Sequence, residues 1–212
     1  MFRKHINNHK NEDLLLFLKA IHNEDYGLIK SLITENKIDI NAQNGMGQTA
    51  LYKAVLRNNL QLIELLLELG ALTEIGPLGN TPLNAAVQQG NWPVIQLLFK
   101  YHADKNKLNG SNSTILHSAV IEVKLSDGAL KPNWDLITWL IEQGIDYNYK
   151  DKFGRKVKDI LCSVDTGYGK VLDKIIENHL KGTKSPIKME GIFYATEDLP
   201  SQTSEPPKKK LK

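Results

Sequence analysis

The residues that could support catalysis or bind a metal are few and scattered in this 212-residue chain. Cys162 is its one cysteine, so an internal disulfide is excluded and a multi-cysteine zinc site lacks ligands. His5 and His9 stand four residues apart, which suits a helical metal site, but no third ligand lies near them. We therefore expect no metal or cofactor, and we interpret residues 1–11 as a polar, disordered lead-in.

The segment Thr166-Gly167-Tyr168-Gly169-Lys170 superficially resembles a phosphate-binding loop. Such a loop needs four residues between its glycines and a Ser or Thr directly after its lysine, and both features are missing. No nucleophile, carboxylate pair or ligand set points to a reaction. An enzyme is therefore the least favoured of the function classes, and no catalytic residue is predicted.

The composition is that of a globular protein whose body is neutral. Hydrophobic residues make up 41% and charged residues 24% of the chain, which excludes a wholly disordered or collagen-like protein. Basic and acidic residues are equal in number between residues 14 and 181, so direct nucleic-acid binding is not expected. No apolar run reaches membrane-spanning length, and the first 13 residues do not resemble a signal peptide. These features predict an intracellular, cytoplasmic protein without membrane contact.

Turn residues and apolar residues recur with a period of 32 to 33 residues. Threonine opens the pattern at Thr49, Thr81 and Thr114, with leucine two residues later and alanine five residues later. Thirteen residues after the first two threonines, the apolar residues of 62–67 and 94–99 have the spacing of one helix face. Each period therefore predicts two helices.

The same frame extends in both directions and predicts five units. The first unit lacks the threonine turn, as a terminal cap would, and Lys156 replaces the threonine in the fifth. An insertion at 124–133 lengthens the fourth unit and is expected to form an exposed loop. The predicted units are 12–42, 43–74, 75–107, 108–149 and 150–181.

These repeats resemble those of ankyrin-repeat proteins over residues 12–181. The resemblance implies an all-α repeat solenoid of about five stacked helix–turn–helix units with β-turn tips. One unit cannot bury its apolar helix face alone, so neighbouring units must stack into a continuous core. Threonine is expected to cap the inner helices, His117 to make a structural hydrogen bond in its turn, and Ala54, Ala86 and Ala119 to allow close packing.

The resemblance also implies a non-catalytic module that binds a partner protein on its concave surface. Contacts in the family come mostly from the turn tips and from the solvent-facing end of the inner helix. Several of these positions are apolar where water is expected, and an exposed apolar patch commonly marks an interaction site. The predicted contact residues are Met46, Gln48, Leu56, Arg57, Leu78, Asn80, Gln88, Gln89, Ser111, Ser113, Ile121, Glu122, Lys152, Phe153 and Arg155.

The C-terminal segment 182–212 breaks the helical pattern with four prolines. Its composition predicts a flexible, mostly disordered tail, in which Ile192-Phe193-Tyr194 is expected to pack on the fifth unit or, alternatively, to bind a partner. The closing lysines resemble a short nuclear-import signal for an import receptor, with a solubilising tail as the alternative. These lysines are Lys208, Lys209, Lys210 and Lys212.

Two function classes besides an enzyme follow from these features. The first is the protein-binding module described above. The second is a nuclear regulatory adaptor, in which the repeats hold one protein and the tail directs import into the nucleus. The Lys- and Asn-rich, cysteine-poor composition also resembles ankyrin proteins that intracellular bacteria deliver into host cells, so an effector in the host cytosol or nucleus is a further expectation.

Overall fold

The computed structural model describes residues 3–35, 38–121 and 132–182, with only the backbone given for residues 3–12 and Ile121. These residues form ten α-helices and one short 3-10 helix, η1. The elements are α1 (Arg3–Asn23), α2 (Tyr26–Thr34), α3 (Ala50–Leu56), α4 (Leu60–Glu68), η1 (Pro77–Gly79), α5 (Pro82–Gln88), α6 (Trp92–Lys100), α7 (Ile115–Ile121), α8 (Trp134–Glu142), α9 (Val157–Val164) and α10 (Thr166–Leu180).

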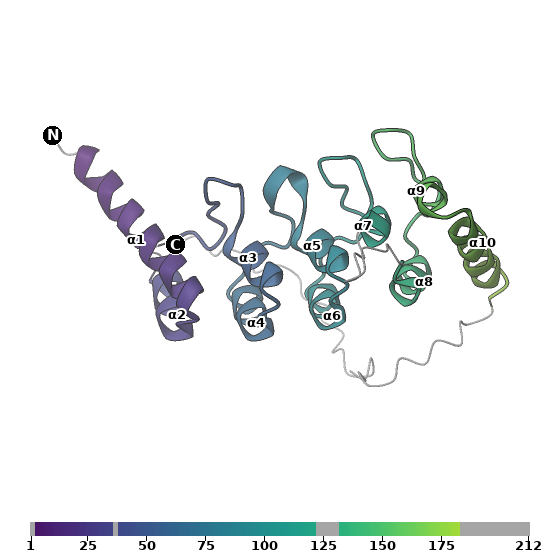
Figure 1. The fold of residues 1–212 in the computed structure, drawn as a ribbon. Coiled ribbons are helices and arrows are strands. Elements are labelled where there is room, and N and C mark those ends of the chain that lie inside the picture. Colours follow the sequence, from purple (N-terminus) through teal and green to yellow (C-terminus); the bar gives the residue numbers. More distant parts are fainter. Residues whose placement is uncertain (1–2, 36–37, 122–131, 183–212) are drawn as a thin grey trace, which may run out of the picture.

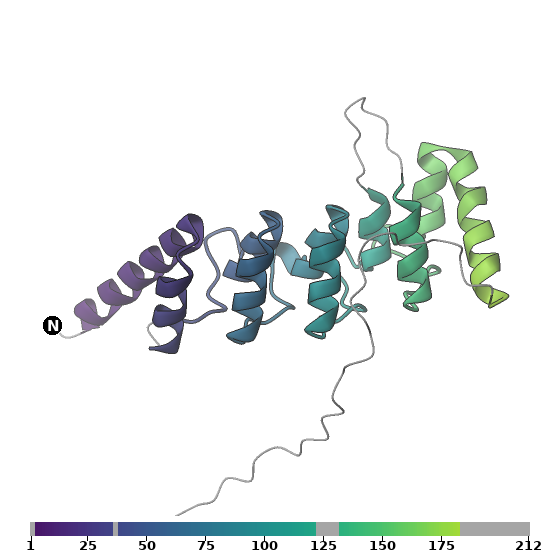
Figure 2. The ribbon, with the colours of Figure 1, turned by 90° about the horizontal axis from the view of Figure 1, so that it is seen from below.

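Consecutive helices pack as antiparallel pairs that stand in a row (Figure 1). We number these pairs as units one to five, from α1–α2 to α9–α10. Helices α3, α5, α7 and α9 form an inner layer, and Figure 2 shows the same row from the side of the outer helices. Each inner helix contacts the inner helix of the next unit. The expected all-α repeat solenoid is therefore confirmed.

Local capping explains where the inner helices begin. The hydroxyls of Thr49 and Thr81 accept hydrogen bonds from the N–H three residues on, at 3.1 and 3.2 Å. Pro82 then fits the first turn of α5, where its missing N–H needs no partner. At the fifth unit Lys156 has no hydroxyl, and the carboxylate of Asp159 accepts the N–H of Lys156 at 2.8 Å, which is the reciprocal bond that Asn84 makes to Thr81 in unit three.

The outer helices begin with a different capping residue that the repeat pattern did not reveal. In four of them a side-chain oxygen of Asn or Asp accepts the N–H three residues on, at 2.9 to 3.3 Å. Directly before two of these caps, Glu24 and Asn58 have φ near +57°, which reverses the chain between the two helices of a unit. The capping residues are Asp25, Asn59, Asn91 and Asn133.

A continuous apolar core lies between the two layers. The repeated leucines and alanines of the inner helices are buried, including Leu83 and Ala86 of α5. Small alanine side chains let adjacent helices approach closely, as the sequence predicted. On the outer side, the ring of Trp139 makes edge contacts with Trp92 and Phe99 at centroid distances of 5.3 and 4.9 Å. These tryptophans therefore stabilise the stack of units three and four.

Buried polar side chains link each inner helix to the next unit. The hydroxyl of Tyr52 accepts a hydrogen bond from the amide of Asn80 at 3.0 Å. One unit later, the amide of Asn84 donates to the hydroxyl of Ser118 at 3.4 Å. Because these groups are shielded from water, each bond favours one alignment of neighbouring units.

His117 makes the corresponding link between units four and five. Its Nδ1 accepts the N–H of Thr114 at 3.3 Å, so the proton resides on Nε2, which donates to the Arg155 carbonyl at 3.2 Å. Burial lowers the pKa of His117, and the hydrogen bond to Arg155 opposes this shift only in part. The neutral imidazole is therefore a structural group, as the turn position predicted.

Residues 3–12 differ from the disordered lead-in that the sequence suggested. Helix α1 begins at Arg3, and Phe17 and Ile21 anchor its second half in the core. No proline or glycine lies between residues 3 and 23, and a helix extends readily from turns that are already anchored. Polar composition was therefore an insufficient reason to expect disorder there.

Candidate functional site

Each unit from the second to the fifth presents a turn immediately before its inner helix. We call these turns fingers: finger two is 44–48, finger three 76–80, finger four 109–113 and finger five 151–155. Figure 1 shows them projecting beyond the inner helices on one side of the row. They contain most of the predicted contact residues.

Fingers two, four and five share one hydrogen-bonded geometry. Their first residue is Asn44, Asn109 or Asp151, whose side-chain oxygen accepts the N–H groups two and four residues on, at 2.8 to 3.1 Å. The N–H of the same residue donates to the carbonyl four residues on at 3.0 Å. Such Asx bonds hold each finger in one conformation.

Finger three lacks this Asx residue and adopts another shape. Gly76 stands at that position, and a Cβ there would lie 1.9 Å from the carbonyl oxygen of Asn80. The tip residue Leu78 has φ of 52°, which is unusual for leucine and costs backbone energy. This conformation leaves the leucine side chain at the tip almost wholly in water.

Neighbouring fingers contact one another through their backbones. A Cβ on Gly110 would lie 2.0 Å from the carbonyl oxygen of Leu78, so fingers three and four touch closely. The N–H of Lys152 in finger five donates to the carbonyl of Ser111 in finger four at 3.1 Å. These contacts join the fingers into a supported row, which limits the entropy lost when a ligand binds.

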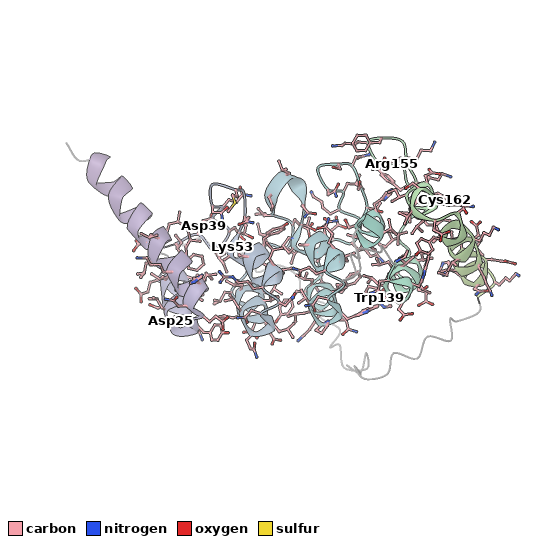
Figure 3. The ribbon with its side chains drawn as sticks, in the orientation of Figure 1. Asp25, Asp39, Lys53, Trp139, Arg155 and Cys162 are labelled. Atoms are coloured by element: carbon pink, nitrogen blue, oxygen red, sulfur yellow. The ribbon has the colours of Figure 1, made fainter. Side chains whose placement is uncertain are left out.

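Apolar side chains stand exposed at three of the four fingertips. The exposed fractions are 69% for Met46, 93% for Leu78 and 67% for Phe153, and Leu56 at the end of α3 is 41% exposed. In Figure 3, Arg155 of finger five and Trp139 of the outer helix α8 lie on opposite sides of the row. We call Met46, Leu78 and Phe153 the apolar fingertips.

Two cations flank the aromatic ring of finger five. The ring of Phe153 lies 5.0 Å from the ammonium of Lys152 and 4.9 Å from the guanidinium of Arg155. Arg155 also pairs with the buried carboxylate of Asp151 at 2.8 Å. Burial acts to raise the pKa of Asp151, but hydrogen bonds from Arg155 and Phe153 outweigh it and lower the pKa.

Some predicted contact residues instead connect one unit to the preceding one. The guanidinium of Arg57 contacts Nδ1 of His22 at 2.9 Å and the Ile21 carbonyl at 3.5 Å. The amide of Gln89 donates to the carbonyl of Leu56 at 3.1 Å. Both side chains reach the end of the previous inner helix, so their first role is structural.

Within the fingers, polar side chains also serve the fold. Ser113 is buried and donates to the carbonyl of Ser111 at 3.3 Å, which corrects the expectation that it faces a partner. The side chain of Gln48 accepts from Asn44, and Asn80 reaches Tyr52 as described above. These residues are shielded because the adjacent unit packs against the turn.

The structure describes the side chains of only some of the remaining predicted contact residues. Gln88 and Ser111 are half-buried at the surface, and Lys152 is exposed. Ile121 ends α7 with only its backbone described, and Glu122 lies outside the described residues. The first eight residues of the insertion and the tail from 183 onward, with its lysines and its aromatic cluster, also lie outside them.

The residues whose types suggested a phosphate loop or a reactive thiol have roles in helix packing instead. Thr166–Lys170 forms the start of α10, where the Asp165 carboxylate accepts the N–H of Gly167 at 2.7 Å. A Cβ on Gly169 would lie 2.3 Å from Sγ of Cys162, so this glycine lets α9 and α10 meet. Among the described residues no group of three His, Cys, Asp or Glu could hold a metal ion, and none of the helices could cross a membrane.

Sequence reasoning missed the basic residues beside finger five. Lys150 is exposed and Lys156 is half-buried, and both flank the turn that carries Phe153. Five of the nine residues from 150 to 158 are basic. The neutral charge of the whole body concealed this local signal.

Comparison with known proteins finds the repeats in other chains. Residues 16–109 match the ankyrin repeats model of three copies. The phosphocholine transferase AnkX of Legionella pneumophila is 30% identical over 147 residues, 66% of this chain and 16% of that protein. NF-kappa-B inhibitor alpha of Sus scrofa is 30% identical over 149 residues, 66% of this chain and 44% of that protein. ANK repeat-containing protein nipk-1 of Caenorhabditis elegans is 33% identical over 148 residues, 63% of this chain and 24% of that protein.

The chain spans less than half the length of each of these relatives, so the similarity concerns the repeats and not the whole proteins. The matching model covers units one to three, and the paired helices and Asx-bonded fingers continue through units four and five. The sequence period, the stacked helix pairs and the family model thus agree, and this chain is an ankyrin-repeat protein.

Proposed function

We propose that this protein is a non-catalytic module that binds a partner protein across its fingers and inner helices. The observation that carries the proposal is the row of apolar fingertips, Met46, Leu78 and Phe153. Exposure of large apolar side chains to water is unfavourable, and their burial by a partner lowers the free energy. The backbone of Leu78 is in the left-handed region, which is strained for leucine. Such strained residues cluster at functional sites in natural proteins.

The structure of the fingers supports this role. Asx bonds and backbone contacts between fingers fix the surface before any partner arrives, so little entropy is lost on binding. The inner helices behind them are joined by buried polar bonds. Ankyrin repeats generally act as protein-binding modules.

One relative is a bacterial transferase, so ankyrin regions also occur within enzymes. The composition and this bacterial relative support, as part of the same proposal, an effector that binds its partner inside a host cell. The alternative is a nuclear adaptor whose lysines at 208–210 and 212 direct import. A large fluorescent fusion of the full chain that stays cytoplasmic, with or without these lysines, would exclude that alternative.

A capture experiment tests the proposal. The full chain is immobilised and compared with the variant Met46→Ser/Leu78→Ser/Phe153→Ser and with a matched control, Leu60→Ser/Val171→Ser/Leu180→Ser. The control changes three exposed apolar residues on the outer helices α4 and α10. Circular dichroism first establishes that both variants are folded.

Proteins bound by the native chain should also bind the control and be depleted at least about tenfold by the fingertip variant, because each true anchor contributes more than about 1 kcal/mol. Mass spectrometry measures the depletion. If the fingertip variant captures the same proteins at the same level, the fingers are not the binding surface.

A further inference from the structure

Charge is distributed unevenly along the solenoid. We define the finger side as residues 43–57, 76–91, 108–121 and 150–164, which contain the fingers and inner helices of units two to five. Among the outer helices, α4 and α8 carry two acidic residues each and no basic residue, α2 and α6 carry one lysine each and no acidic residue, and α10 carries two of each. The charged residues of the finger side are Lys53, Arg57, Lys150, Lys152, Arg155, Lys156 and Lys158, with Asp151 and Asp159.

The two acidic residues of the finger side are used within the fold. Asp151 is buried, accepts two backbone N–H groups and pairs with Arg155. Asp159 accepts the backbone N–H of Lys156 at 2.8 Å. The charge that this side presents to a ligand is therefore predominantly positive.

Unit five holds most of that positive charge. Among the residues that the structure describes, no carboxylate lies within ion-pair distance of Lys150, Lys152 or Lys156. The ammonium of Lys156 donates to the neutral side-chain carbonyl of Asn148 at 3.1 Å. We call Lys150, Lys152, Arg155 and Lys156 the basic cluster.

The middle of the finger side is apolar or neutral. Residues 75–99 contain no charged residue, and 108–121 contain only His117, which is buried. A nucleic acid places a phosphate at every step and needs cations along its whole path. The finger side of units three and four offers none, whereas apolar side chains of a peptide would meet no unpaired charge there.

We infer that the partner contributes an acidic segment with apolar side chains, which contact the apolar fingertips while its carboxylates lie at the basic cluster. This inference rests on the proposed function and names the class of its partner. Stacked helices lie about 10 Å apart. An extended peptide rises about 3.4 Å per residue, so roughly nine residues reach from finger two to finger five.

A peptide library tests this directly. Phage that display random peptides of about 16 residues, enough to span the fingers in extended form, are selected on the immobilised full chain. Enriched peptides are synthesised with a fluorescent label, and their affinities are measured by anisotropy. The proteins are the native chain, Lys152→Glu/Lys156→Glu, and the control Lys170→Glu/Lys174→Glu, which makes the same charge change at exposed positions of α10.

The enriched peptides should be rich in Asp, Glu and apolar residues. They should bind the native chain and the control equally, and bind Lys152→Glu/Lys156→Glu at least about tenfold more weakly. Raising the salt concentration should weaken binding to the native chain, because exposed charges are screened.

Other outcomes separate this inference from the proposed function. If enriched peptides are neutral or basic, or bind Lys152→Glu/Lys156→Glu unchanged, the acidic class is wrong. In that case, loss of binding in the fingertip variant would still support the proposed function, and unchanged binding would overturn it as well. Failure to enrich any peptide would also overturn the inference. So would a random DNA duplex that binds the native chain more tightly than the peptides do and binds Lys152→Glu/Lys156→Glu more weakly than the native chain.

Discussion

The buried imidazole of His117 couples the stability of units four and five to pH. Its Nδ1 accepts the Thr114 N–H, and protonation of that nitrogen would break this bond, leaving only the Thr114 hydroxyl at 2.9 Å as an acceptor. Because burial lowers the pKa, the unfolded chain binds a proton at His117 more readily than the folded chain. The free energy of unfolding must then fall as the pH drops below about 6.5, the value of an unperturbed histidine.

Replacement of His117 by asparagine tests this coupling. In unit three, Asn84 already occupies the same position and accepts the Thr81 N–H at 3.1 Å, so the cap can persist in His117→Asn. Urea unfolding between about pH 5 and pH 7.5 should show a shallower loss of stability in the variant. The difference in slope is at most about 1.4 kcal/mol per pH unit. Equal slopes would mean that His117 is not held neutral.

The sequence predicted the residues whose roles depend on local contacts. Thr49 and Thr81 cap helices through bonds to residues three positions away, so their spacing was sufficient. Arg57 was assigned to the partner surface because sequence spacing does not reveal its contact with the preceding unit, and the turn position of Ser113 likewise does not reveal its burial. The place of a residue in the repeat pattern indicates its position in the unit, but it does not show whether the next unit buries its side chain.

At the scale of elements, the contact between α9 and α10 depends on one glycine. Glycine inside a helix ordinarily costs about 1 kcal/mol relative to alanine. Gly169 is nevertheless required because a Cβ there would meet Sγ of Cys162 at 2.3 Å. The glycine that suggested a phosphate loop is thus explained by helix packing, which its sequence pattern alone could not reveal.

Gly169→Ala should therefore destabilise the protein by about 1–3 kcal/mol, the usual effect of overpacking. In a Cys162→Ala background the same substitution should be neutral or stabilising, because the sulfur is gone and alanine favours the helix. A double-mutant cycle of thermal unfolding measures this sign change. If Gly169→Ala destabilises both backgrounds equally, the glycine serves some other contact.

Considered as a whole molecule, the solenoid depends on contacts between neighbours. Its repeat period predicted the stack, because units that expose an apolar face must cover one another. The helix at residues 3–12 and the basic cluster were not predicted from the sequence. Both judgements used average composition or net charge, which does not show where in the fold each residue lies. Leu83 lies in the middle unit and is 1% exposed, so its truncation removes contacts on both sides.

Leu83→Ala should lower the free energy of unfolding by about 2–5 kcal/mol. Hydrogen exchange should become faster in units two and four as well as in unit three, because the middle unit couples both flanks. Leu180→Ala, at an exposed position of α10, serves as the control and should change stability by less than about 0.5 kcal/mol. Faster exchange confined to α5 would contradict a coupled stack.

The central claim is that the fingertips contact a partner protein, and site-specific photo-crosslinking tests it most directly. A benzophenone amino acid replaces Leu78, at the tip of finger three, or Leu180, an exposed leucine of the outer helix α10. After irradiation in lysate of the cells in which the protein acts, position 78 should give covalent adducts of discrete mass that position 180 does not. Adducts from position 180 alone, with none from position 78, would contradict the account.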